Sequence, residues 1–312
     1  MVIRMPHTPC TLRLLAGGAL ALLLISGCAA FDDDRSGIVV TTNILGDVTE
    51  TIVGDQTDVT VLMQPNADPH SFGISAQQAA ELEEAELVVY NGLGLEEEVL
   101  ANVEAAADAG TPTLEVGAEA GPIDYTAGDS AGEPDPHFWT DPLRMIDAVD
   151  AITDSILDEV SGVEAGEVEA NAADYRAEVE ELHDYAEERF DEIPRDQRSL
   201  VTNHHVFGYL AERYDFEVIG AVVPSGTTLA SPSSADLNSL AEAVTEAGVP
   251  AVFADSSQPD RLAEVMAEEA DIEVEVVSLY SESLTEEGEG AETYLEMTRS
   301  NVDTITEGLT SE

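Results

Sequence analysis

The chain has 312 residues, of which 65 are acidic and 11 are basic, so its formal net charge is -54 at pH 7. Phosphate groups need cationic partners, and this charge therefore excludes nucleic acid as a partner. A surface this acidic is typical of a protein that stays soluble in high salt, where charge repulsion is screened, and it predicts a halophilic or salt-tolerant source.

Residues 1–27 have the pattern of a secretory signal, with a weakly basic start, an apolar stretch and small residues before a cysteine. The Ile-Ser-Gly-Cys sequence that ends at Cys28 resembles a bacterial lipobox, in which the cysteine is lipidated and becomes the first mature residue. The apolar stretch is too short to span a membrane comfortably. We therefore expect a lipoprotein signal peptide over 1–27, lipidation of Cys28 and a flexible tether over 28–37. Cleavage by an ordinary signal peptidase is the alternative.

The first half of the mature chain alternates short apolar runs with helical patterns, which predicts a parallel sheet with crossover helices. Strands are predicted at 38–42, 59–63, 87–91 and 113–116. Helices are predicted at 45–53, 75–85, 96–107 and 141–160. A long surface loop rich in Gly, Asp and Pro is predicted at 117–136. Because ligands bind at the carboxyl ends of parallel strands, loops that follow these strands are candidate binding sites.

A long helix is predicted over residues 164–194, because its apolar positions recur at steps of three and four. These positions are Val168, Ala172, Tyr175, Val179, Leu182, Ala186, Phe190 and Ile193. At about 1.5 Å per residue the helix would span roughly 45 Å before Pro194 ends it. We read it as a helix that joins two α/β halves. The alternative is a helical hairpin that packs on a single domain.

The alternation of strands and helices resumes after this helix, although the two halves share no evident sequence repeat. Strands are predicted at 200–203, 218–223, 250–254 and 274–279. Helices are predicted at 205–214, 233–247, 259–269 and 291–309. The predicted fold is α/β, with two lobes that are each a mostly parallel sheet flanked by helices. The predicted boundaries are 38–162 for the N-terminal lobe, 163–194 for one long rigid linking helix and 195–312 for the C-terminal lobe.

Six histidines occur in the sequence, and three of them stand in loops at strand ends or directly after prolines. These three are His70, His137 and His204, and the first two share the sequence Asp-Pro-His. The proline fixes the backbone, and the aspartate can orient the imidazole from outside the ligand set. Three neutral imidazoles with one carboxylate form a closed site for a transition metal. His205 is the adjacent candidate, whereas His183 lies off the apolar stripe of the long helix and is predicted to be solvated.

Five motifs occur in order through most of the mature chain. They are Pro65-Asn66-Ala67-Asp68-Pro69-His70-Ser71-Phe72, Asn91-Gly92-Leu93-Gly94-Leu95-Glu96, Asp135-Pro136-His137-Phe138-Trp139-Thr140-Asp141-Pro142, His204-His205-Val206-Phe207-Gly208-Tyr209 and Leu279-Tyr280-Ser281-Glu282-Ser283-Leu284. Together they resemble the cluster A-I solute-binding proteins, the metal-binding receptors of ABC importers for zinc and manganese.

The resemblance implies a monomeric receptor, not an enzyme, with one metal site in the cleft between two lobes. It implies a lipid-anchored protein at the outer face of the cell membrane that delivers its metal to an ABC permease and ATPase. A secreted zinc hydrolase is disfavoured, because the His-Glu-x-x-His motif is absent and four ligands leave no open position for substrate. A surface adhesin is compatible with a lipid anchor but gives the three histidines no purpose.

Carried over position by position, the resemblance implies His70 and His137 as ligands from the N-terminal lobe. It implies His204 as the first ligand from the C-terminal lobe, three residues before the aromatic residue of the Phe-Gly-Tyr motif. Glu282 stands where the family most often has aspartate, so its longer side chain leaves the bonding mode open.

Two further residues are reserve candidates. His205 falls where the family usually has a small or acidic residue, and Asp255 ends a predicted strand at the same edge of the sheet. The resemblance places Asp255 near the cleft rather than on the metal.

The expected metal is zinc, with manganese as the alternative. Three imidazoles and a carboxylate suit zinc, and the Irving–Williams order favours it over manganese. Manganese receptors of the family often replace the third histidine with a carboxylate, which this chain does not. Against zinc, residues 121–136 lack the histidine-rich run that zinc receptors often carry.

Overall fold

The computed structural model describes residues 35–270 and 272–310. The predicted signal peptide and Cys28 lie outside these residues. At the end of the range predicted as a tether, the N–H group of Ser36 donates to the carbonyl of Glu84 at 3.1 Å. Within the described residues, no helix combines the length and the apolar composition needed to cross a membrane.

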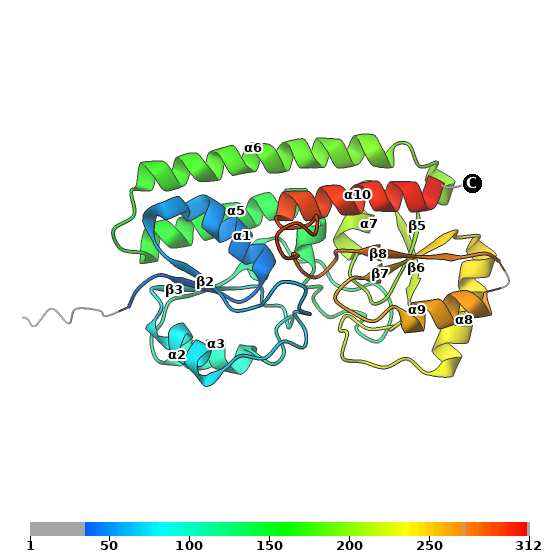
Figure 1. The fold of residues 1–312 in the computed structure, drawn as a ribbon, viewed down its shortest axis with the longest axis horizontal. Helices are drawn as coiled ribbons and strands as arrows, with labels where there is room; N and C mark the ends of the chain where they lie inside the picture. Colours follow the sequence, from blue (N-terminus) through cyan, green and yellow to red (C-terminus); the bar gives the residue numbers. More distant parts are fainter. Residues whose placement is uncertain (1–34, 271, 311–312) are drawn as a thin grey trace, which may run out of the picture. The chain divides into compact units, whose positions relative to one another are not determined.

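Two parallel four-stranded sheets form the framework of the described chain (Figure 1). The first has the order β2-β1-β3-β4 and the second the order β6-β5-β7-β8, so both follow the same pattern. The first contains β1 (Ile38–Val40), β2 (Val59–Val61), β3 (Leu87–Tyr90) and β4 (Thr113–Glu115). The second contains β5 (Ser199–Thr202), β6 (Glu217–Ala221), β7 (Ala251–Asp255) and β8 (Glu275–Leu279). We call each sheet with its helices a lobe, N-terminal and C-terminal, and the predicted two-lobed α/β fold is confirmed.

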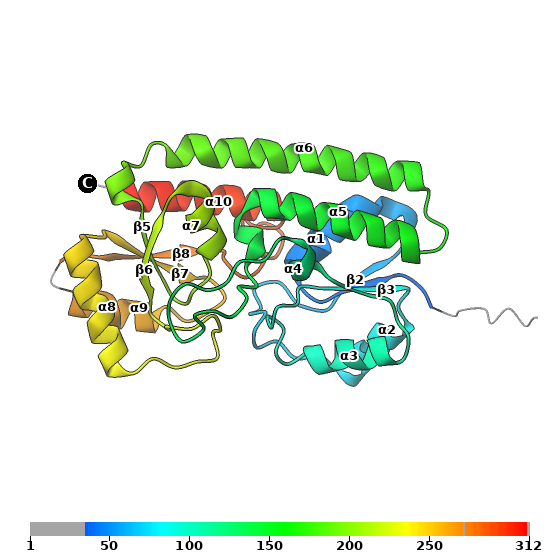
Figure 2. The ribbon, with the colours of Figure 1, turned by 180° about the vertical axis from the view of Figure 1, so that it is seen from behind.

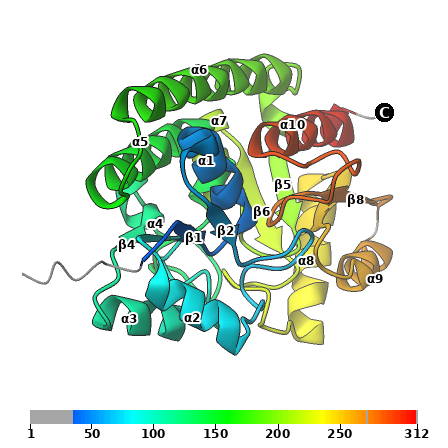
Figure 3. The ribbon, with the colours of Figure 1, turned by 60° about the vertical axis from the view of Figure 1, so that its left-hand side comes forward.

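Helices cover both faces of the first sheet, with α1 and α5 on one side and α2 and α3 on the other (Figure 3). They are α1 (Asn43–Val53), α2 (Ala76–Glu84), α3 (Leu100–Asp108), the short α4 (Val116–Glu119) and α5 (Pro142–Glu159). The second sheet is flanked by α7 (Gly208–Tyr214), α8 (Ser234–Ala247), α9 (Arg261–Glu269) and α10 (Tyr294–Thr310). Single 3-10 turns occur at Gly54–Gln56, Phe138–Thr140 and Arg195–Gln197.

The long helix α6 (Ala165–Phe190) joins the two lobes and lies along α5 and α10 (Figure 2). All eight apolar positions predicted for its stripe are buried. The positions from Val168 to Leu182 belong to the hydrophobic core of the N-terminal lobe. Ala186 and Phe190 belong to the core of the C-terminal lobe. A single helix that is anchored in both cores restrains the movement of one lobe relative to the other.

Helices α3 and α7 begin later than the sequence predicts, because hydrogen bonds outside the helix hold the residues expected at their start. Helix α3 begins at Leu100 and not at Glu96, whose buried carboxylate accepts hydrogen bonds from the backbone N–H groups of Asn91 (2.7 Å) and Gly92 (3.0 Å). Helix α7 begins at Gly208 and not at His205. The His205 N–H instead donates to the carbonyl of Ser225 at 3.0 Å.

The composition of residues 117–136 predicts a surface loop, but part of this loop is buried. Tyr125 and Asp135 are buried within it. The N–H of Asp129 donates to the carbonyl of Pro224 at 2.8 Å, and the hydroxyl of Tyr125 donates to the carbonyl of Gly226 at 3.2 Å. This loop of the N-terminal lobe therefore packs against a loop of the C-terminal lobe.

The burial of α6 predicts the effect of shortening its side chains. Leu182 is 1% exposed, so Leu182→Ala should lower the free energy of unfolding by about 2–5 kcal/mol, since it removes buried methyl groups and leaves a cavity. The matched change Leu262→Ala, at a position that is 42% exposed on α9, should alter it by less than about 0.5 kcal/mol. Chemical denaturation of both variants checks this, and equal losses would contradict the placement of α6 in the core.

Candidate metal centre

Four side chains predicted as ligands meet in one buried cluster. The chain brings His70 from the loop after β2, His137 from the turn before Phe138, His204 from the end of β5 and Glu282 from the loop after β8. One ligand atom of each lies within 4.8 Å of the others. The Nε2 atoms of His70, His137 and His204 lie 3.8, 3.5 and 3.2 Å from a carboxylate oxygen of Glu282. The cluster therefore combines two histidines from the N-terminal lobe with two ligands from the C-terminal half of the chain.

Several polar atoms of this cluster have no hydrogen-bond partner in the described structure. Both carboxylate oxygens of Glu282 and the Nε2 atom of His204 are buried without a hydrogen bond in the described structure. Buried polar atoms are nearly always paired, because an unpaired one costs desolvation energy. A divalent cation at the centre would satisfy these atoms together, so the donor set fits a transition metal.

Burial sets the protonation of the cluster. It lowers the pKa of His70 and of His137 well below the ordinary value, and it also lowers the pKa of His204. Neighbouring imidazoles lower the first two further. Burial raises the pKa of Glu282 well above its ordinary value, and nearby aspartates add to the shift. These shifts favour the neutral imidazoles that metal binding requires, and they favour the protonated form of the Glu282 carboxyl group, whose proton a bound cation would displace.

Asp135 orients the ring of His137, as the Asp-Pro-His sequence predicts. Its Oδ1 atom lies 2.7 Å from His137 Nδ1 and also accepts the His137 backbone N–H at 3.0 Å. Burial raises the pKa of Asp135 to about 7, and the backbone hydrogen bond opposes that shift. In its ionised form this carboxylate accepts a hydrogen bond from Nδ1–H of His137, and that tautomer presents an unprotonated Nε2 to the cluster.

Asp68 occupies the same position before His70 but acts differently. Its Oδ1 atom accepts the backbone N–H of His70 at 3.0 Å, whereas Nδ1 of the His70 ring is buried without a hydrogen bond. The prediction of an acid that orients the imidazole is therefore wrong for His70. Asp68 fixes the backbone of this ligand and not its ring.

Two residues of the N-terminal lobe fix the loop that carries Glu282. The indole N–H of Trp139 donates to the carbonyl of Ser281 at 2.9 Å. Asn43 donates to the hydroxyl of Ser283 at 2.8 Å. The sequence motifs contain Trp139 and both serines, but no local signal indicates that Asn43, 240 residues away from Ser283, reaches this loop.

Asp255, a reserve candidate, lies outside the ligand cluster. Its Oδ2 atom accepts the N–H (3.2 Å) and the hydroxyl (2.5 Å) of Ser281, and its Oδ1 atom accepts the N–H of Ser257 at 2.7 Å. These hydrogen bonds occupy the carboxylate and hold Ser281 beside Glu282. Asp255 thus supports the loop of a ligand.

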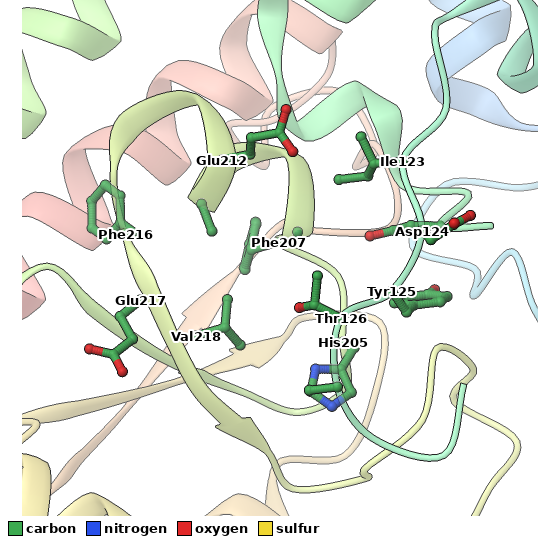
Figure 4. A pocket seen from close by; sticks show the side chains of 14 residues that line it. Ile123, Asp124, Tyr125, Thr126, His205, Phe207, Glu212, Phe216, Glu217 and Val218 are labelled. Carbon is green, nitrogen blue, oxygen red and sulfur yellow. The ribbon is translucent and has the colours of Figure 1, made fainter. Parts of the chain in front are cut away.

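His205 also lies outside the cluster and faces a separate cavity of about 410 Å³. Figure 4 shows its ring among the side chains of this cavity, which include Tyr125 and Phe207. Burial lowers the pKa of His205, and the adjacent His204 adds to the shift. The backbone bond to Ser225 turns this residue away from its neighbour.

His183 is half-buried rather than fully solvated, which corrects the prediction. Its Nδ1 atom lies 3.0 Å from the hydroxyl of Tyr214. Asp184 and Glu187 are exposed near it on α6, and the three could approach one cation. Such exposed acidic groups are frequent on a chain of this composition, so we assign this group no role.

Comparisons with known proteins all find metal-binding receptors. The family profile described as ZnuA, zinc-uptake complex component A, periplasmic, matches residues 38–308. The manganese-binding lipoprotein MntA of Halalkalibacterium halodurans is 28% identical over 92% of this chain and 95% of its own length. The zinc-binding protein TroA of Treponema pallidum is 29% identical over 89% of this chain and 90% of its own length. The solved structure of the periplasmic zinc binding protein TroA from Treponema pallidum has a TM-score of 0.79 and 27% identity, covering 88% of this chain and 99% of that one.

The raised pKa of Glu282 predicts a pH dependence of metal binding. Below that pKa the free site holds one proton on Glu282, so binding should release about one proton, and the affinity should fall as the pH decreases. The lowered pKa values of the histidines move proton competition by the imidazoles to more acidic pH. Calorimetry at mildly acidic pH, in buffers with different ionisation enthalpies, counts the released protons.

The isosteric variant Glu282→Gln is the control for this count. Its neutral amide has no proton to lose, so it should bind metal more weakly and release none. Proton release that is unchanged in Glu282→Gln, or absent in the parent, would show that the carboxyl group is ionised in the free site.

Proposed function

This chain belongs to the family of periplasmic zinc-uptake components, and on that premise we propose that it is a receptor that captures zinc between its two lobes for an ABC importer. Members of this family are solute-binding receptors and not enzymes, which confirms the resemblance drawn from the five motifs. The observation that carries the proposal is the buried cluster of three imidazoles and one carboxylate, whose unpaired atoms face one another.

The proposed ligands are His70, His137, His204 and Glu282. All four side chains are buried around a common centre. A cation at that centre would coordinate the Glu282 oxygens and His204 Nε2, which have no hydrogen-bond partner. Since both lobes contribute ligands, metal binding and the relative position of the lobes are coupled. Helix α6 is anchored in both cores, so we expect small lobe shifts rather than a wide hinge motion. The lobe boundaries 38–162, 163–194 and 195–312 stay a prediction.

The proposed cargo is zinc, and manganese is the second candidate. Three nitrogen donors and one oxygen donor favour zinc, whereas manganese prefers sites richer in oxygen. Relatives named for manganese, such as MntA of Halalkalibacterium halodurans, support the second candidate. We base the choice of zinc on the donor set, because these donors are residues of this chain, whereas the names of relatives describe other proteins.

The proposed location is the outer face of the cell membrane, where a lipid on Cys28 would hold the receptor beside its permease and ATPase. The lipobox-like sequence supports this location, and relatives that are named lipoproteins, such as MntA of Halalkalibacterium halodurans, agree with it.

Single substitutions test the proposed ligand set by zinc calorimetry at fixed pH. His70→Ala, His137→Ala and His204→Ala should each weaken zinc binding at least about tenfold, because water replaces an imidazole ligand only partly. Glu282→Ala should also weaken it, and Glu282→Asp should recover part of the loss. Manganese should bind the parent at least about tenfold more weakly than zinc.

Two matched histidine variants accompany this series. His205→Ala and His183→Ala should bind zinc as the parent does, since both rings lie outside the cluster. Loss of binding in His205→Ala, with His204→Ala unaffected, would mean that the ligand register is displaced by one residue.

The lipid anchor is tested by Cys28→Ala in the full-length chain. The variant should leave the membrane fraction and appear in the soluble extracytoplasmic fraction, with unchanged zinc affinity, because Cys28 is not among the proposed metal ligands. Fractionation followed by immunoblotting measures this, and a variant that stays with the membrane would rule out lipidation of Cys28 as the anchor.

A further inference from the structure

The proposed metal site is closed to solvent. His70 and Glu282 are 1% exposed, and His137 and His204 are 0% exposed. A metal ion cannot reach or leave such a site unless some part of its wall moves. The part of the wall that moves would set the rates of metal binding and release.

A cavity of about 330 Å³ in the C-terminal lobe reaches one of the ligands. His204 and Asn203 line its inner end, and Thr228, Gln258 and Leu262 are among its other lining residues. Leu262 is 42% exposed, so the cavity extends to the protein surface. This cavity is therefore a candidate passage between solvent and the metal site.

Two residues that line this cavity also bind the loop that carries a ligand from the other lobe. Thr228 donates its hydroxyl to Oδ2 of Asp68 at 2.7 Å, and Gln258 donates its side-chain amide to the same oxygen at 2.8 Å. The other oxygen of Asp68 accepts the backbone N–H of His70. We call Asp68, Thr228 and Gln258 the Asp68 latch.

Residues 227–233, which contain Thr228, contribute no side chain to the buried hydrophobic core, whereas Val222 just before them belongs to it. Residues 222–233 include no helix or strand, and Leu229 beside Thr228 is 49% exposed. Gly226 donates its N–H to the hydroxyl of Ser130 at 3.1 Å, and Thr227 donates to the carboxylate of Glu97 at 2.8 Å. Both partners belong to the N-terminal lobe. Segments with few buried apolar contacts open at low cost compared with a packed core.

We propose that the Asp68 latch is the gate of the metal site. When its two hydrogen bonds between lobes break, residues 227–233 separate from the Asp68 loop, and the cavity at His204 becomes continuous with the ligand cluster. This inference rests on the proposed metal-binding function, and it assigns Thr228 and Gln258 as residues that control metal exchange without binding the metal.

The latch should affect the rates of metal binding and release more than the affinity for metal. Its hydrogen bonds do not include a metal ligand atom, so they stabilise the closed form by a similar amount with and without metal. A contact of equal strength in the metal-free and the metal-bound protein leaves the equilibrium between these two states unchanged. Weakening the latch should therefore accelerate metal binding and release together.

Stopped-flow kinetics with zinc test the latch in the full mature chain. Trp139 is the single tryptophan of the sequence, and its ring centroid lies 5.2 Å from that of His137, so its fluorescence reports metal binding. Release is measured by transfer of zinc to excess chromophoric chelator. Thr228→Val removes one hydrogen bond without changing the shape, and Gln258→Glu places a second carboxylate against Asp68.

Both variants should bind and release zinc about tenfold faster, the factor expected for loss of a hydrogen bond to an ionised group, with a Kd within about threefold of the parent. Thr228→Ser keeps the hydroxyl and should behave as the parent. Matched controls are Thr51→Val, whose hydroxyl bonds within α1, and Gln77→Glu, which faces Glu81 on the surface. Neither control should change the rates.

Unchanged rates in Thr228→Val and Gln258→Glu would overturn the latch. Faster release with an unchanged binding rate and an equally weakened Kd would also overturn it, because Asp68 would then support His70 rather than gate the site. A parent protein that does not bind zinc would overturn the proposed function and the latch together, whereas a parent that binds with unaltered variants overturns the latch alone.

Discussion

The structure depends on the burial of three imidazoles and one carboxylate around a single point. Removing these groups from water keeps the histidines neutral and raises the pKa of Glu282, and it leaves ligand atoms that no protein group pairs. Such an arrangement is costly unless a cation occupies the centre. The surrounding contacts therefore hold four loops from distant parts of the chain in this arrangement.

Both lobes fix the site through contacts around the ligands. Asp135 orients His137, Asp255 holds Ser281 next to Glu282, and the indole N–H of Trp139 binds the carbonyl of the same serine from the other lobe. Helix α6 contributes to both hydrophobic cores and so keeps the lobes at a nearly constant separation. Helix α6 thus restrains the lobes, whereas the irregular residues 227–233 between them carry the proposed gate.

The sequence predicts the elements whose residues repeat locally, and its motifs contain the four side chains that meet in the cluster. The stripe of α6 is an example, since a period of three and four residues defines a buried face regardless of its partners. Features that depend on distant partners are not predictable in this way. The carboxylate of Glu96 accepts a hydrogen bond from the hydroxyl of Thr41, 55 residues away, and this residue lies in a loop rather than in α3. Asp68 and Asp135 share a local sequence but not a role. Asp68 instead accepts hydrogen bonds from Thr228 and Gln258, which lie at least 160 residues away from it.

The central claim is that one metal ion is held by ligands from both lobes. A crystal structure of the protein grown with equal concentrations of zinc and manganese, with anomalous scattering recorded at both absorption edges, tests it most directly. The account predicts one zinc ion bound by Nε2 of His70, His137 and His204 and by an oxygen of Glu282. A metal ion bound by residues of one lobe alone, or centred on His205, would contradict it.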